Sequence, residues 1–167
     1  SRDQSTGTSS PTRSLFFGGT DGASPSSAEL NTIDFVTIAS TGNASDFGDL
    51  TAASSYRGTA SSGIRGFSCG GGIGGNGDDT IEFVTFASTG NMTDFGDLVD
   101  DTRNMASSDN SRSGFLFGGH PGINTIQQWD LVTLGNGTDW ADMSSTNTSG
   151  GAGVSESHGG ISDDNLS

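Results

Sequence analysis

The chain contains no lysine and only six arginines against 20 acidic residues, so its formal net charge is −14. A surface this acidic repels nucleic acid and anionic membranes, and we expect neither as a partner. It also stays hydrated at high salt, where its self-repulsion is screened. This balance suits a marine or otherwise salty extracellular setting and, equally, simple solubility.

Cysteine and histidine are almost absent. The single cysteine, Cys69, excludes an intramolecular disulfide, and its position favours a buried apolar filler over a reactive thiol. His120 and His158 lie in no nucleophile or metal motif. A Gly-x-Ser-x-Gly elbow, a phosphate-binding loop and a Cys-x-x-Cys pair are also missing. We therefore expect no enzyme: no catalytic residues, no cofactor and no metal.

Long apolar runs and helical periodicity are lacking too. Hydrophobic residues make up 29% of the chain, and no apolar run approaches the length that spans a membrane. What is abundant is Gly (28), Ser (27) and Thr (19). Short runs such as SLFFGG, IDFVTI and GFLFGG, bounded by Gly, Asn and Asp, are typical of strands. The sequence therefore predicts an all-β fold.

The chain repeats itself. FVTIASTGNASDFGDL at 35–50 returns as FVTFASTGNMTDFGDL at 83–98, and a degenerate copy ends in DWADM. Glycine doublets mark the period: Gly18-Gly19, Gly70-Gly71, Gly118-Gly119 and Gly159-Gly160. We divide the chain into 1–13 (the end of a preceding repeat or a closing strand), 14–65, 66–112 and 113–158 (repeats 1 to 3) and 159–167 (the start of a decayed repeat or a tail).

Each repeat has room for about four short antiparallel strands. The central strand, as in TIDFVTI, is apolar on both faces, which is typical of a strand between two neighbouring sheets. The doublet glycines permit positive φ and close passage of backbones. We expect the aromatic residues of the last strand, Phe47, Phe95 and Trp140, to pack between sheets as equivalent anchors.

These features resemble the kelch repeat. The resemblance rests on the Gly-Gly doublet after an apolar strand, on an aromatic-x-x-Leu about 30 residues later (Phe47 with Leu50, Phe95 with Leu98), and on a following Arg57 or Arg103. The third copy has Trp140 with Met143 and lacks the arginine. The resemblance implies four-stranded blades of a β-propeller. The sequence TGNASDFGDL is similar to repeats in structural proteins of marine bacteriophages, especially cyanobacterial viruses.

Two polar patterns recur with the repeat. Carboxylate pairs follow the turn (Asp46/Asp49, Asp94/Asp97, Asp139/Asp142) and could ligate Ca²⁺, although turn capping and solvation explain them more simply. Asn43, Asn91 and Asn136 each begin an Asn-x-Ser/Thr sequence in the same turn, and Asn147 and Asn165 add two more. The three turn asparagines should be exposed, and they would carry glycans only if the chain passes through a glycosylating secretory route.

The sequence favours a non-enzymatic structural or adhesive module of an extracellular particle, such as a phage fibre, capsid protrusion or tail appendage. Its partners would be copies of itself or other particle proteins. A carbohydrate-binding propeller that reads host surface glycans, a propeller-scaffold enzyme and a glycoprotein subunit of an extracellular filament remain alternatives. Closed propellers have four to eight blades, so three repeats leave an incomplete ring and predict that other sheets cover its ends.

Overall fold

The computed structural model describes residues 2–22, 28–147, 151 and 153. The described part of the chain is built from strands, turns and loops, and it contains no helix that could span a membrane. The prediction of an all-β fold is confirmed for these residues. His158, the fourth doublet Gly159-Gly160 and Asn165 lie outside them.

The strands form three antiparallel sheets, each built from consecutive segments of the chain. Sheet 1 contains β1 (Thr6–Ser9), β2 (Arg13–Phe17), β3 (Thr32–Thr37) and β4 (Ser45–Asp49) in that order. Sheet 2 contains β5 (Gly58–Ser61), β6 (Arg65–Cys69), β8 (Asn76–Thr85) and β9 (Thr93–Thr102), with the short β7 (Gly72–Ile73) beside β8. Sheet 3 contains β10 (Ala106–Asp109), β11 (Ser113–Gly119), β12 (Ile123–Asp130) and β13 (Thr138–Asn147).

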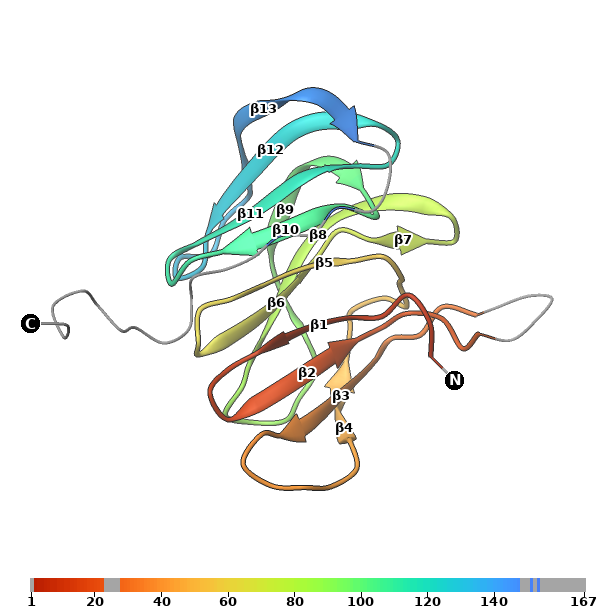
Figure 1. Cartoon of the computed structure of the whole chain (residues 1–167), viewed down its shortest axis with the longest axis vertical. Coiled ribbons are helices and arrows are strands. Elements are labelled where there is room, and N and C mark those ends of the chain that lie inside the picture. Colours follow the sequence, from red (N-terminus) through yellow and green to blue (C-terminus); the bar gives the residue numbers. More distant parts are fainter. Residues whose placement is uncertain (1, 23–27, 148–150, 152, 154–167) are drawn as a thin grey trace, which may run out of the picture.

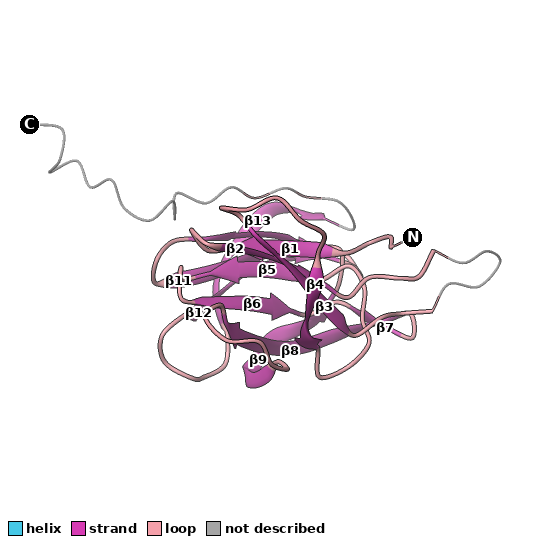
Figure 2. Ribbon diagram, turned by 90° about the horizontal axis from the view of Figure 1, so that it is seen from below, coloured by secondary structure: helices cyan, strands magenta, loops and turns pink. Residues whose placement is uncertain are grey.

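The three sheets follow one another in space as they do in sequence. Figure 1 shows sheet 1 in red and orange at one end, sheet 2 in yellow and light green in the middle, and sheet 3 in green, cyan and blue at the other end. Their first strands lie side by side, with β5 between β1 and β10. Figure 2 shows the sheets from below, with β1 and β5 side by side.

The sheets are offset from the sequence repeats by one strand. Each sheet begins with a strand of small and polar residues (TGTS, GTAS or ASSD) that precedes the apolar strand and its glycine doublet. The Arg57 segment at the end of repeat 1 therefore leads into the first strand of sheet 2. These strands have no apolar alternation, so only their pairing with β2, β6 and β11 assigns them to a sheet.

Two hydrophobic cores lie between the sheets. The core between sheets 1 and 2 contains the buried side chains of Leu15, Phe17, Ile33, Phe47, Leu50, Val84, Phe86 and Met92. The core between sheets 2 and 3 contains those of Ala60, Phe67, Cys69, Ile81, Phe95, Leu98, Met105, Leu116, Trp129 and Leu131. Sheet 2 contributes to both, which explains why its central strand is apolar on both faces.

Candidate functional site

The most regular feature of the molecule is the interface between successive sheets. We call the interface of sheets 1 and 2 seam 1, and that of sheets 2 and 3 seam 2. The front face of a sheet is the face that packs on the preceding sheet, and the back face packs on the following one. Each seam is built from residues at equivalent positions of the repeat, so the two seams can be compared bond by bond.

In seam 1 the turn between β8 and β9 binds the last strand of sheet 1. The amide of Gly90 donates to the carbonyl of Phe47 (2.8 Å), and the amide of Met92 donates to the carbonyl of Asp49 (2.8 Å). The side-chain oxygen of Asn91 accepts a hydrogen bond from the amide of Asp49 (3.1 Å). Three hydrogen bonds thus join a turn of one sheet to the edge strand of the sheet before it.

Seam 2 repeats this arrangement. Gly135 donates its amide to the carbonyl of Phe95 (3.1 Å), and Gly137 donates to the carbonyl of Asp97 (2.7 Å). The side-chain oxygen of Asn136 accepts from the amide of Asp97 (3.2 Å). The turns of sheets 2 and 3 have the same length, and in each the Gly-Asn dipeptide and the residue after it make the same three bonds.

The receiving strand needs glycine where the turn approaches it. A Cβ atom on Gly96 would lie 2.5 Å from the carbonyl oxygen of Gly135, closer than non-bonded atoms approach. Gly48 meets the carbonyl of Gly90 in the same way in seam 1. In sheet 3 the equivalent position is Ala141, which pairs with Ile126 as Gly96 pairs with Ile81. The back face of sheet 3 therefore lacks the space that the other two sheets provide.

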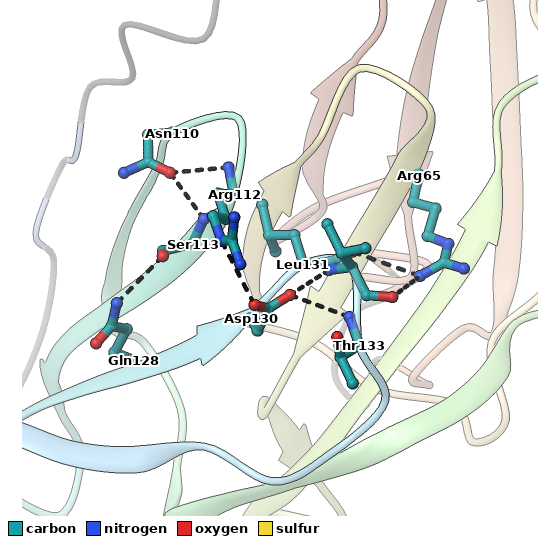
Figure 3. A network of polar contacts seen from close by, with 9 residues as sticks. Arg65, Asn110, Arg112, Ser113, Gln128, Asp130, Leu131 and Thr133 are labelled. Atoms are coloured by element: carbon teal, nitrogen blue, oxygen red, sulfur yellow. Dashed lines mark hydrogen bonds and ion pairs between the residues drawn. The ribbon is translucent and has the colours of Figure 1, made fainter.

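An arginine of each receiving sheet holds the start of the incoming turn. Arg13 donates to the carbonyl of Phe86 (2.5 Å), with its guanidinium over the ring of Phe35. Arg65 donates to the carbonyls of Leu131 (3.4 Å) and Val132 (2.9 Å), as Figure 3 shows, and lies over the ring of Phe83. Such cation–π contacts fix the guanidinium between ring and carbonyl.

Sheet 3 has neither part of this clamp. Ser113 stands at the arginine position and pairs with Asp130, as Arg65 pairs with Thr85. Gln128 stands at the position of Phe83 and donates to Ser113 (3.1 Å). Asp130 instead caps the turn, because its carboxylate accepts from the amides of Val132 (2.7 Å) and Thr133 (3.0 Å). These backbone donors lower the pKa of the Asp130 carboxyl.

A buried polar side chain crosses each seam in the middle of the sheet. In seam 1 the carboxylate of Glu82, which is fully buried, accepts from the amide of Thr51 (2.9 Å). In seam 2 the side chain of Gln127, 1% exposed, accepts from the amide of Val99 (2.5 Å). Thr51 and Val99 each follow the leucine of the DFGDL motif. The equivalent residue of sheet 1 is Asp34, which pairs with Arg2 (3.1 Å).

The charge of Glu82 is compensated inside the protein. Arg57, also buried, lies 2.7 Å from the Glu82 carboxylate, 3.6 Å from that of Asp78, and donates to the hydroxyl of Ser68 (2.6 Å). Arg57 is thus the centre of a buried polar network. Breaking one member of such a network is costly because the other charge stays buried.

The segments that lead into the first strands of the three sheets are joined by residues with a left-handed backbone conformation. Gln4, Tyr56 and Asn104 each have positive φ and each stands two residues before the first strand of its sheet. The amide of Tyr56 donates to the carbonyl of Gln4 (3.3 Å), and that of Asn104 to the carbonyl of Tyr56 (2.9 Å). A backbone hydrogen bond therefore passes from each sheet to the next.

The glycine doublets lie beside these residues, with positive φ in all three described copies. Gly19 donates to Ser54 (2.8 Å) and Gly71 donates to Thr102 (2.8 Å). A Cβ on Gly70 would lie 2.7 Å from the carbonyl of Thr102. The doublets thus provide both the backbone conformation and the space for the chain that enters the next sheet.

The predicted aromatic anchors do not share one environment. Phe47 is 2% exposed and Phe95 is 4% exposed, each within a seam. Trp140, at the equivalent position of sheet 3, is 59% exposed and packs edge-on against Phe115. This departs from the expectation that all three are buried alike, because no described residue of another sheet lies against the back face of sheet 3.

The other predicted polar residues are exposed or structural. Asn43, Asn91 and Asn136 are all at the surface. Of the carboxylate pairs, Asp94 accepts from the amide of Gly96 (3.1 Å), as expected of a turn cap. The described residues contain no cluster of His, Cys, Asp or Glu that could hold a metal ion.

Cys69 is fully buried in the core of seam 2, and burial raises the pKa of its thiol far above the ordinary range. The prediction of a buried filler is confirmed. His120 lies in the loop after the third doublet, where its backbone pairs with that of Arg103.

A polar depression of about 300 Å³ lies beside Gln4 and Tyr56, which precede the first strands of sheets 1 and 2. Its walls include Glu29, Tyr56 and Arg103. The carboxylate of Glu29 accepts from Gly74 (2.8 Å) and Ser55 (3.3 Å), and Arg103 donates to the carbonyl of Gly75. These side chains are occupied by the loops around them. The depression therefore offers a polar surface whose charged side chains are already hydrogen-bonded to neighbouring loops.

Three comparisons relate the chain to known proteins. Its sequence matches no family model and no curated protein. Its fold is similar to that of the solved structure titled "Structure of YjhT", with a TM-score of 0.72 and 12% sequence identity. The match covers 88% of this chain and 54% of that chain, so this chain spans about half the length of the structure it matches. At this identity the likeness shows the fold alone.

Proposed function

We propose that this chain is a non-enzymatic structural or adhesive repeat module of an extracellular particle, with three kelch-like propeller blades whose ring is incomplete. The observation that carries the proposal is that the same seam is built twice. Glycine, asparagine and aromatic residues that recur in the repeat are those that hold one sheet on the next. The recurring residues thus serve assembly of the scaffold, and none of them is needed for chemistry at a single centre.

The proposed mechanism is display on a rigid scaffold. The loops between the second and third strands differ in length and sequence between repeats, whereas the seam residues recur. Loops carried by a packed scaffold are the parts of a protein that vary and make contacts with other molecules. The acidic surface, with a net charge of −14, keeps such a module hydrated outside the cell.

The repeat sequence resembles that of marine phage proteins, and we therefore prefer a role as part of a virion, as a fibre, capsid protrusion or tail appendage. In this setting the chain contacts copies of itself or other particle proteins, without nucleic acid or membrane.

A carbohydrate-binding propeller is the second candidate, and the polar depression is the observation that favours it. Tyr56, 38% exposed, could stack on a sugar ring beside the polar groups of Glu29 and Arg103. The third candidate, a glycoprotein subunit, is favoured by the exposure of Asn43, Asn91 and Asn136. Intact mass separates it from the first two, because an unmodified chain has a mass of 16.9 kDa.

Immunogold electron microscopy tests the proposed setting. Antibodies raised against the purified chain are applied to intact particles from the culture fluid of the source organism or its virus. Labelling of the outside of the particles is the expected result. Label confined to the interior of cells, with none on any released particle, would contradict the proposal.

A further inference from the structure

The front face of sheet 1 has the parts of a seam but no sheet to receive it among the described residues. The turn of sheet 1 carries the same Gly42-Asn43 dipeptide that binds the preceding strand in sheets 2 and 3. Asn43 is exposed, and an ideal Cβ on Gly42 would have nothing within 4 Å. The amides equivalent to those of Gly90 and Met92 belong to Gly42 and Ala44, which have no partner in the described structure.

Apolar side chains around this turn are also uncovered. Ile38 is 54% exposed, whereas its equivalents Phe86 and Leu131 are 3% and 1% exposed. Phe16 is 40% exposed, whereas Leu116 at the same position in sheet 3 is fully buried in seam 2. The front face of sheet 1 therefore carries a turn of the type that binds a preceding sheet. It also carries apolar side chains whose equivalents named above are buried in a seam.

The back face of sheet 3 does not match it. Three of the residues that receive a turn elsewhere are replaced there: arginine by Ser113, phenylalanine by Gln128 and glycine by Ala141. The Cβ of Ala141 would occupy the space in which Gly96 admits the carbonyl of Gly135. Head-to-tail stacking of two copies of this chain would thus lose the clamp and meet a steric clash.

We propose that the front face of sheet 1 docks a partner β-sheet of the same repeat type that is not sheet 3 of a second copy of this chain, with an Asp-aromatic-Gly-Asp edge strand and an arginine at the start of its second strand. The two internal seams define this chemistry. The glycine admits the Gly42-Asn43 turn, the strand carbonyls accept from the Gly42 and Ala44 amides, and the arginine binds the carbonyl of Ile38. The inference rests on the proposed function, since it treats the sheets as units of one assembly.

The test uses a receptor probe made from the chain itself. The probe has the seam residues restored on sheet 3 (Ser113→Arg, Gln128→Phe and Ala141→Gly), and Ile38→Glu on sheet 1 prevents it from binding its own kind. Sedimentation velocity of an equimolar mixture of this probe and the wild-type chain should show a 1:1 complex. Wild-type chain alone should bind itself at least about tenfold more weakly, because it lacks the receiving residues.

Matched variants of the wild-type chain locate the contact. Ile38→Glu should abolish binding to the probe, whereas Ile64→Glu should leave it unchanged, because Ile64 is 70% exposed in a different turn. Asn43→Ala should weaken binding roughly tenfold by removing the acceptor for the partner's strand amide. If the triple probe fails to fold by circular dichroism, the chain with Ala141→Gly and Ile38→Glu serves as a second probe with a smaller expected gain.

Three results would overturn the inference: no complex with either folded probe, self-association of the wild type as tight as its binding to the probe, or equal weakening by Ile38→Glu and Ile64→Glu. The second of these would make another copy of this chain the occupant. Because the test uses purified chains, its failure is distinct from a failure of particle labelling, which concerns the proposed function alone.

Discussion

Glycine has a different task at each of its recurring positions. The doublet glycines have positive φ and leave space for the chain that enters the next sheet, whereas Gly48 and Gly96, also at positive φ, leave space for the carbonyl of a turn in the next sheet. Gly90 makes a hydrogen bond across seam 1, but a Cβ atom added to it would have nothing within 4 Å. An added methyl group therefore has both a steric and a conformational cost at Gly96, and no steric cost at Gly90.

Gly96→Ala should destabilise the fold by about 1–3 kcal/mol, the usual cost of forcing a methyl group into a packed site. The added Cβ would lie 2.5 Å from the carbonyl oxygen of Gly135, and seam 2 would have to open to relieve it. Gly90→Ala is the matched control and should change stability little, because nothing lies within 4 Å of its Cβ position. Urea denaturation measures both, and an equal loss in the two variants would contradict the seam geometry.

The folded protein disfavours the charged form of the Asp79 carboxyl. Burial, followed by the nearby carboxylates of Asp97 and Asp101, raises the pKa of the Asp79 carboxyl. A raised folded-state pKa means that the stability associated with this group is present at low pH and lost as pH rises through that pKa. Ionised Asp79 therefore opposes folding at neutral pH.

Asp79→Asn should stabilise the protein at pH 7 by up to about 0.5 kcal/mol, a small effect because the site is largely open to solvent. The gain should vanish at a pH below the pKa of an unfolded aspartate, about 3.9, where the wild-type carboxyl is neutral as well. Thermal melts at pH 7 and at acidic pH measure the difference. Added salt should reduce the part of the gain that comes from Asp97 and Asp101, and a gain that grew at acidic pH would show that the ionised Asp79 carboxylate is not its cause.

At the scale of elements, the last strand of each sheet depends on whether another sheet follows. Phe95 on β9 is enclosed by seam 2 and packs edge-on against Phe67 and Phe83. Trp140 on β13 contacts Phe115 and is otherwise open. The larger side chain therefore contributes less to stability.

Phe95→Ala should cost about 3–5 kcal/mol, the typical loss for a buried phenylalanine. Trp140→Ala should cost less than about 1 kcal/mol, because its side chain is 59% exposed. Equilibrium unfolding in urea compares the two. Equal losses would mean that the back face of sheet 3 is covered in solution.

Most strands and two of the buried aromatic residues could be predicted from the sequence. The apolar runs between glycine doublets are strands, and Phe47 and Phe95 lie between sheets, because both patterns depend on local alternation and on direct repetition. The assignment of β1, β5 and β10 to their sheets could not be predicted, because small polar strands carry no burial pattern. Trp140 could not be placed either, since its burial depends on a following sheet.

The seam itself was missed in the sequence, although a signal for it exists. Asn91 and Asn136 were interpreted as glycosylation sites, whereas the structure gives their side-chain oxygens a partner in the preceding sheet. The signal is a correlation between repeats: each DFGD strand with glycine is followed, one repeat later, by a Gly-Asn turn. Arg13 and Arg65 also recur at the same distance before the doublet, but only the structure shows that their partners lie in the next sheet.

At the scale of the whole molecule, the three sheets are held by two equivalent seams and leave the front face of sheet 1 without a receiving strand in the described structure. This directionality follows from the order of the chain, because the turns of sheets 2 and 3 each bind the sheet before them. Polar side chains reinforce the same direction, since Glu82 and Gln127 each accept from the strand end of the preceding sheet. The central claim is that this repeated hydrogen-bonded seam organises the molecule.

Native-state hydrogen exchange of the full chain, followed at single amides by NMR, tests this claim most directly. The amides of Gly90, Met92, Gly135 and Gly137 donate across the seams, whereas those of Gly42 and Ala44 occupy the same positions in sheet 1 without a partner in the described structure. The account predicts strong protection of the first four amides and rapid exchange of the last two. Equal protection of Gly42 and Ala44, or rapid exchange at all six positions, would contradict it.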